Sequence, residues 1–306
     1  MKTMSEEDVD LGTEDAPPAR REDFEANGPI EIDIAIGTGR IEIQLVDEPG
    51  VRVEVRHAPE SDDQWVPGLS GLLNWVSGQF GGGPQDNSPE ETVRQTRIDL
   101  TGNRLVVRTP KPLPMRGMPL SVVVKAPSGS HVETKSGSAS LAVTGSAGRV
   151  NVTSGTGDIS VDRADGAASV QSASASVRLG PMLGGVRVKT GSGDLEVSSV
   201  GGPSLLFTGT GDIWLGAVQS DVTVRTGSGD VTVADAACGR IEVVTGSGEL
   251  RVAVRSGVKA QVDLVSYSGR AYSELALSDT PPPGEPSLFV RGRTGSGTAV
   301  ITTAVG

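Results

Sequence analysis

Residues 186–203 read VRVKTGSGDLEVSSVGGP, two runs of alternating apolar and polar residues separated by the word TGSGD. Similar words return as FTGTGDIWL, VRTGSGDVTV and VVTGSGELRV. We number each unit from the residue after its second glycine, called position zero. A strict period of this kind predicts a solenoid in which each repeat forms one coil. In the middle of the chain, position zero recurs every 18 residues, at Ser140, Asp158, Ser176, Asp194, Asp212 and Asp230.

Each repeat has room for two strands and no helix. Val186 and Val188 alternate with polar residues before the glycine word, and Leu195 and Val197 do so after it. This period of two is typical of half-buried strands. Two strands of about five residues and two short turns account for the whole repeat. We therefore predict an all-β fold, a parallel β-solenoid with coils of two short strands, wound in the right-handed sense.

The glycine word is predicted to form a corner of the coil. Glycine adopts positive φ without steric cost, and a bare turn lets neighbouring coils stack closely. Four residues before position zero the side chain is always a hydroxyl, and its parity points it inward, where it can bond the turn backbone. These residues are Ser136, Ser154, Ser172, Thr190, Thr208, Thr226, Thr245, Ser266 and Thr294.

The acidic residue at position zero invites functional interpretations besides a structural one. The stacked carboxylates from Asp194 to Glu249 could bracket calcium or act in catalysis. Their spacing differs from that of calcium-binding nonapeptide repeats, and a solvated row of acids needs no catalytic role. A phosphate cradle is excluded because no helix follows the glycine word. We predict no catalytic residue, no metal site and no cofactor, with cation binding by the row left as an open alternative.

The chain is predicted to form one solenoid domain after an acidic leader. Residues 1–28 are expected to be a disordered leader, because nine acidic and three basic residues fall within the first 25. We expect a solenoid over residues 29–306, with irregular coils over 29–126, regular repeats over 127–256 and irregular coils over 257–306. After Asp230, position zero continues less regularly at Glu249, Arg270 and Thr298.

Residues 59–95 interrupt the first irregular coils with a helical or flexible insertion. The stretch WVPGLSGLLNWVSGQF places apolar residues on one face of a predicted helix. This helix could cap the solenoid or contact a protein partner, and it lacks the Lys and Arg that anionic membranes favour. A further large apolar residue, Trp214, occupies an outward position of a strand. The candidate partner contacts are Trp65, Leu69, Leu72, Trp75, Phe80 and Trp214.

The repeated Gly-Asp word at this spacing resembles a bacterial family of unknown function labelled "putative adhesin". The segment from Gln261 to Val305, with its Pro-rich excursion, is similar to the closing coils of the actinobacterial members. The resemblance covers residues 29–306 and implies an all-β repeat fold. It also implies display outside the cell, and it transfers no catalytic or ligand-binding residue.

Composition narrows the functional classes. A formal net charge of −11 argues against nucleic acid as a partner. No apolar run reaches membrane-spanning length, and no signal-peptide pattern follows Met1. Cys238 has no second cysteine with which to form a disulfide. We therefore expect the protein in the cytoplasm, and display at the cell surface stays an open alternative. We predict a non-catalytic binding or scaffold protein with an unknown protein partner. Alternatives are a carbohydrate-active enzyme and self-association through the solenoid ends.

Overall fold

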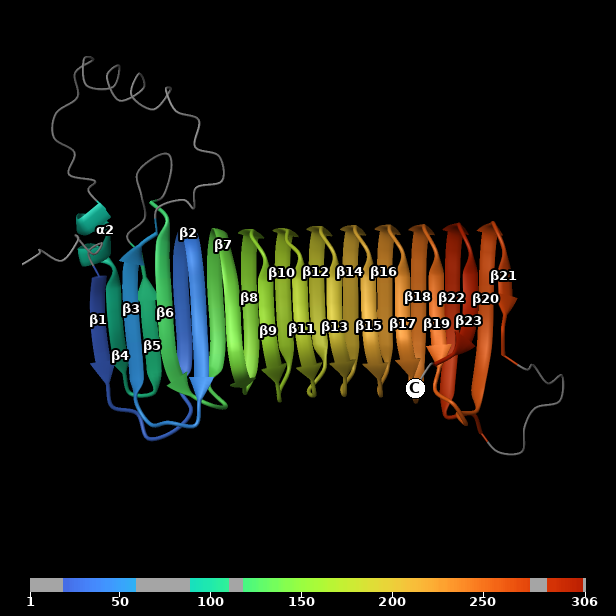
Figure 1. Ribbon diagram of the computed structural model, residues 1–306, viewed down its shortest axis with the longest axis horizontal. Helices are drawn as coiled ribbons and strands as arrows, with labels where there is room; N and C mark the ends of the chain where they lie inside the picture. The colour runs from blue at the N-terminus through green and yellow to red at the C-terminus, as the bar shows by residue number, and fades with distance from the viewer. Residues whose placement is uncertain (1–18, 59–88, 110–117, 276–284, 305–306) are drawn as a thin grey trace, which may run out of the picture.

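The computed structural model describes residues 19–58, 89–109, 118–275 and 285–304. Figure 1 shows their strands stacked as rungs along one long axis, with β1 (Ala19–Phe24) at one end and β20 (Ala260–Ser268) near the other. Within these ranges the fold is all-β apart from one short helix, and the strands of the middle coils pair in parallel. The predicted parallel β-solenoid is confirmed, and its handedness stays a prediction.

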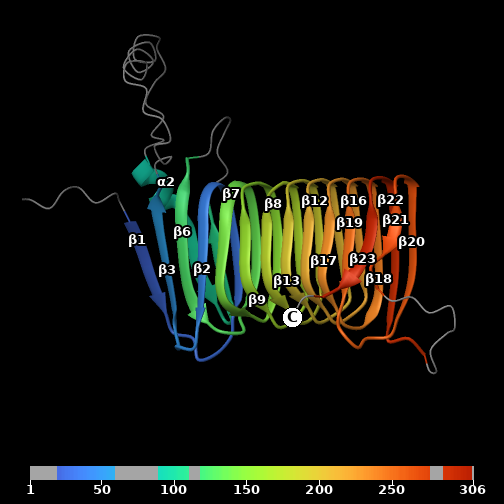
Figure 2. The ribbon, with the colours of Figure 1, turned by 45° about the vertical axis from the view of Figure 1, so that its right-hand side comes forward.

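Each regular coil contributes one strand to each of two sheets, as Figure 2 shows. Strands in one sheet pair in register with the equivalent strand of the next coil, as Val188 does with Leu206 and Leu206 with Val224. The first sheet holds β8 (Arg149–Thr156), β10 (Ala168–Ser174), β12 (Val186–Ser192), β14 (Ser204–Thr210), β16 (Val222–Ser228) and β18 (Gly239–Ser247). The second sheet holds β9 (Ile159–Ala164), β11 (Val177–Met182), β13 (Leu195–Val200), β15 (Ile213–Val218), β17 (Val231–Ala236) and β19 (Leu250–Val254).

The core between the two sheets is thin and aliphatic. Inward residues such as Leu206, Leu215 and Val224 are completely buried. Among the described residues, no Phe, Tyr or Trp belongs to the buried core. Side chains of this size let the two sheets approach closely, so each coil closes with only two strands.

The N-terminal end departs from the parallel pattern. Two long strands, β2 (Glu31–Val46) and β7 (His131–Ala147), run through the corner and contribute to both sheets. Beyond β2 some strands run antiparallel to their neighbours, as residues 51–57 do to 120–127 and residues 97–101 do to 104–108. The second pair is joined by a short turn at Gly102, a connection typical of antiparallel strands. The parallel pairing of the middle coils therefore does not extend through this end. The remaining elements here are β3 (Val51–His57), α2 (Pro89–Gln95), β4 (Arg97–Thr101), β5 (Arg104–Arg108) and β6 (Leu120–Pro127).

The predicted disordered leader is wrong for residues 19–24, which form β1 and pair antiparallel with β3. Alternating charges explain the pairing, since Arg21 contacts Glu54 at 2.9 Å and Arg52 contacts Asp23 at 2.7 Å. The strand covers the edge of β3 that would otherwise be left unpaired. The rest of the predicted leader, residues 1–18, lies outside the described residues.

The C-terminal coils stack out of sequence order. The strands β22 (Leu288–Ser296) and β23 (Ala299–Thr303) lie between the β18–β19 coil and the coil formed by β20 and β21 (Ala271–Ser273). Leu288 and Val290 are buried there, whereas Val262 and Leu264 of β20 are only half-buried. The inner place covers the apolar residues of β22 from both sides, whereas the earlier segment is the outermost rung and leaves its apolar residues partly exposed.

Candidate binding surfaces

The glycine corner is built from hydroxyls and backbone geometry, as predicted. The completely buried Thr208 donates a hydrogen bond from Oγ1 to the Thr210 carbonyl oxygen at 2.9 Å, and Thr226 repeats this bond with Ser228. Gly211 has φ of 133°, and a Cβ atom placed on it would lie 2.3 Å from the carbonyl oxygen of Gly193. Both the backbone conformation and the closeness of the next coil therefore require glycine at this position.

The carboxylates at position zero accept backbone hydrogen bonds from the next coil. The amides of Asp212, Asp230 and Glu249 each donate to Oδ1 of the preceding acid, at 2.9, 2.8 and 2.6 Å. Such charge-assisted bonds offset the repulsion between stacked acids. Within the described ranges no group of three or more His, Cys, Asp or Glu residues is placed to hold a metal ion. The row of acids thus has a structural explanation in the stacking of the coils.

One acid outside this row is buried, at the N-terminal end of the first sheet. The Asp33 side chain is 4% exposed and accepts hydrogen bonds from Nη2 of Arg104 at 2.7 Å and of Arg108 at 2.9 Å. Burial raises the pKa of the Asp33 carboxyl, but the bonds and charges of the two arginines outweigh burial and hold this pKa below its usual value. A shallow hollow of about 220 Å³ beside Asp33 is lined in part by His131 and Arg149.

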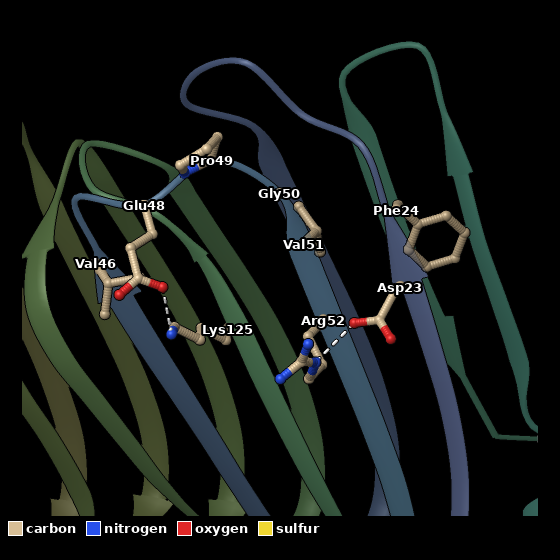
Figure 3. Close-up of a pocket in the computed structure, with 9 residues that line it drawn as sticks. All are labelled: Asp23, Phe24, Val46, Glu48, Pro49, Gly50, Val51, Arg52 and Lys125. Atoms are coloured by element: carbon tan, nitrogen blue, oxygen red, sulfur yellow. Dashed lines mark hydrogen bonds and ion pairs between the residues drawn. The ribbon is translucent and has the colours of Figure 1, made fainter.

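A second hollow of about 220 Å³ lies between β1, β2, β3 and β6, and Figure 3 shows its lining. Its two cations are already paired, Arg52 with Asp23 and Lys125 with Glu48, each at 2.7 Å. The hydrogen bond and charge of Lys125 lower the pKa of the Glu48 carboxyl. These pairs hold neighbouring strands together, so the hollow presents no unpaired cation to a ligand.

Trp214 lies on the outer face of the second sheet and is 40% exposed. It sits between Glu196 and Thr232 of the neighbouring coils, and its ring reaches over Gly216, whose added Cβ would lie 3.1 Å from Cη2. The other five predicted contact residues, Trp65, Leu69, Leu72, Trp75 and Phe80, lie outside the described residues. The structure therefore places one of the six predicted contacts, and the contact surface stays a prediction.

The outer face of the first sheet carries a feature that the sequence reading missed. From Lys189 onward, cations and apolar side chains alternate from coil to coil five residues before position zero, in register across neighbouring strands. The two coils before Lys189 carry the neutral polar residues Thr153 and Gln171 at this position. We call the alternating set the basic–apolar row. Its members, in spatial order, are Lys189, Phe207, Arg225, Val244, Arg293 and Val265.

The basic–apolar row differs in charge from its surroundings. No ion pair joins Lys189, Arg225 or Arg293 to another residue of the described ranges, whereas Arg178 on the opposite face pairs with Glu196 at 3.7 Å. The row itself contains no acid, in a chain of net charge −11. Phe207 and Val244 are 39% and 41% exposed. The sequence alone could have indicated this row, because its members from Lys189 to Val244 occupy one outward position that recurs every 18 or 19 residues.

These features define the class of the protein as a parallel β-solenoid with irregular coils at both ends. The model of the Toastrack family, DUF4097, matches residues 120–280. The match spans more than half of the chain, and the chain belongs to this family. No curated protein matches it. No helix in the described part of the chain is long and apolar enough to cross a membrane.

Several solved structures align with most of this chain at low sequence identity. A putative adhesin from Bacteroides fragilis is 13% identical, with 95% of this chain and 100% of that chain covered and a TM-score of 0.42. A putative adhesin from Parabacteroides distasonis is 10% identical, with 93% and 97% covered and a TM-score of 0.37. A putative lipid binding protein from the same species is 9% identical, with 92% and 96% covered and a TM-score of 0.39. Similarity at this level carries no functional argument.

Proposed function

We propose that the protein is a non-catalytic binding or scaffold protein that contacts a macromolecular partner through the outer faces of its two sheets. One observation supports this proposal above the others. The inward and corner side chains are used in packing and in bonds between coils, while large apolar side chains stay exposed on the outer faces, as at Phe207, Trp214 and Val244. Apolar side chains that gather on one face of a rigid sheet can form an interaction surface, and Phe207 and Val244 lie in one row of the first sheet.

The stacking of the coils suits such a role. Parallel strands about 4.8 Å apart, paired in register, hold equivalent outward residues in rows across the coils. A partner that binds one row meets side chains whose spacing is fixed by the backbone, so little conformational entropy is lost on binding. The same rigidity lets two partners bind at a fixed distance on opposite faces, with Phe207 on one and Trp214 on the other.

Cross-linking of the full chain to its partners in cell extract tests the proposal. We expect Phe207→Ala or Trp214→Ala to reduce recovery of at least one partner tenfold or more. The control is Ser160→Ala, because Ser160 occupies the same outward position as Trp214 three coils away. Unchanged recovery with both variants would contradict a role for the sheet faces. Hydrolysis of a polysaccharide by the chain, lost in Asp212→Ala, would favour a carbohydrate-active enzyme instead.

A further inference from the structure

The basic–apolar row presents one side chain per coil along the solenoid axis. Lys189, Arg225 and Arg293 are exposed cations that alternate with Phe207 and Val244. The strands that carry them pair directly, so each side chain is displaced by one rung from the last. Successive cations are therefore two rungs apart, a separation of about 9.6 Å.

The charge around the basic–apolar row favours an anionic ligand. On the neighbouring outward position, Arg187 and Leu205 extend the basic and apolar character beside Lys189 and Phe207. In the coils of the row the acids on that position are Glu242, which forms no ion pair with any of the three cations, and Asp263, which is paired with Arg291 at 3.1 Å. The three cations of the row thus keep their charge available for carboxylates from a partner.

The spacing of the cations selects the conformation of such a partner. A polyproline II chain has three residues per turn and rises about 3.1 Å per residue, so side chains three residues apart lie on one side about 9.3 Å apart. A β-strand places same-side residues about 6.8 Å apart, which leaves every second carboxylate out of register with the cations. The polyproline II repeat matches the two-rung distance to within about 0.3 Å.

We propose that the basic–apolar row binds an acidic polypeptide in the polyproline II conformation, which lies along the solenoid axis with a carboxylate at every third residue. Carboxylates at positions i, i+3 and i+6 meet Lys189, Arg225 and Arg293. The residues between them, best as prolines, project to either side of this line and contact the flanks of the Phe207 and Val244 side chains. Prolines there also hold the backbone in the bound conformation, so little further backbone entropy is lost. This inference rests on the proposed binding function and names its partner class.

Fluorescence anisotropy with labelled peptides and the full chain tests this proposal. We expect the peptide (Glu-Pro-Pro)4 to bind at least tenfold more tightly than a peptide of the same composition in which the glutamates are grouped in pairs. (Lys-Pro-Pro)4 should not bind. Arg225→Glu should weaken binding of (Glu-Pro-Pro)4 tenfold or more, and higher salt should weaken it further. The control Arg178→Glu changes an exposed cation on the opposite face and should leave binding unchanged.

Four outcomes would overturn the proposal. Equal binding of the two glutamate peptides would show that charge alone is recognised. Binding of phosphatidylserine vesicles that is lost in Arg225→Glu, without peptide binding, would assign the row to a membrane surface. Self-association in sedimentation that is lost in Phe207→Ala, without peptide binding, would assign it to a second copy. If partner recovery from extract still depends on Phe207 while no peptide binds, this inference fails and the proposed binding function stands.

Discussion

The middle of the solenoid and its two ends differ in how their strand edges are paired. In the middle, every strand edge is paired by an equivalent strand, and the acid of one corner accepts the amide of the next, as Asp212 does for Asp230. At the ends no equivalent strand follows, so the chain reverses direction near β2 and changes its stacking order near β22. Regular repeats thus specify their neighbours locally, whereas the ends depend on contacts between distant segments.

The two ends also differ from each other. At the N-terminal end the outer strands β1 and β4 carry charged residues, and α2 contacts β1 and β3. Charged edge strands disfavour pairing with another chain. At the C-terminal end the outermost strands carry Tyr267, 76% exposed, and Tyr272, 46% exposed. The described part of the C-terminal end is therefore the less protected one, and self-association there stays a prediction.

The largest expected effect comes from changing the length of the regular middle. Deletion of residues 195–212 removes one coil in register and should leave a folded, shorter solenoid, because coils contribute nearly additively to stability. Deletion of residues 195–203 removes half a coil and would send a first-sheet strand into the second sheet. We expect cooperative thermal unfolding, followed by circular dichroism, for the first variant only. Equal damage by the two deletions would contradict the coil model.

Alanine substitutions at two glycines test whether the coil corner is more constrained than a turn at the N-terminal end. In Gly211→Ala the new Cβ meets the Gly193 carbonyl at 2.3 Å and φ is 133°, so we expect the free energy of unfolding to fall by about 3 kcal/mol. In Gly102→Ala, φ is 60° and nothing lies within 4 Å, so a loss of about 1 kcal/mol is expected. Urea denaturation measures both, and similar losses would show that stacking does not constrain the corner.

The buried acid of the N-terminal end should make stability depend on pH. The pKa of Asp33 is lowered in the folded state, so its contribution is present above the unfolded pKa of about 3.9 and is lost as pH falls through the folded value. Asp33→Asn should cost about 2 kcal/mol at pH 7, and the difference from wild type should shrink in acid. Asp99→Asn, which changes an exposed pair, is the control. A difference that does not change with pH would contradict this role.

The smallest expected effect concerns the acids of the corners. Asp212→Ala removes the acceptor of the Asp230 amide and should lower the free energy of unfolding by about 1 kcal/mol. Asp158 occupies the same position, but no described backbone amide donates to its carboxylate. Asp158→Ala should therefore change the free energy by less than about 0.5 kcal/mol. Equal effects would show that the acids act through charge and not through this bond.

Much of the middle could be predicted because its determinants recur in each coil. The inward hydroxyl at Thr208 and the glycine at Gly211 follow from the period alone. The order of the C-terminal coils could not be predicted, because the 260–273 and 288–303 segments have similar sequence patterns, and only the structure shows which of them is covered on both sides. The strand at Ala19–Phe24 was missed since its stability comes from pairs with Arg52 and Glu54, far along the chain.

The candidate surfaces, too, could be predicted only where the determining residue stands out in the sequence itself. Trp214 was found because a large aromatic residue at an outward position stands out by itself. The basic–apolar row was missed because each member is unremarkable alone, and its pattern appears only when equivalent positions of several coils are read together. Its far end also needed the structure, since Arg293 follows Val244 in space although 49 residues separate them in the sequence.

The position of β22 and β23 has a consequence for biosynthesis. A ribosome releases residues 260–273 before residues 288–303, yet the earlier segment rests on the later one. The earlier segment therefore cannot form its final strand pairs with β22 and β23 until these strands have emerged and docked on β18 and β19. Assembly can spread outward from the middle while translation continues, but the outermost rung is the last to be fixed.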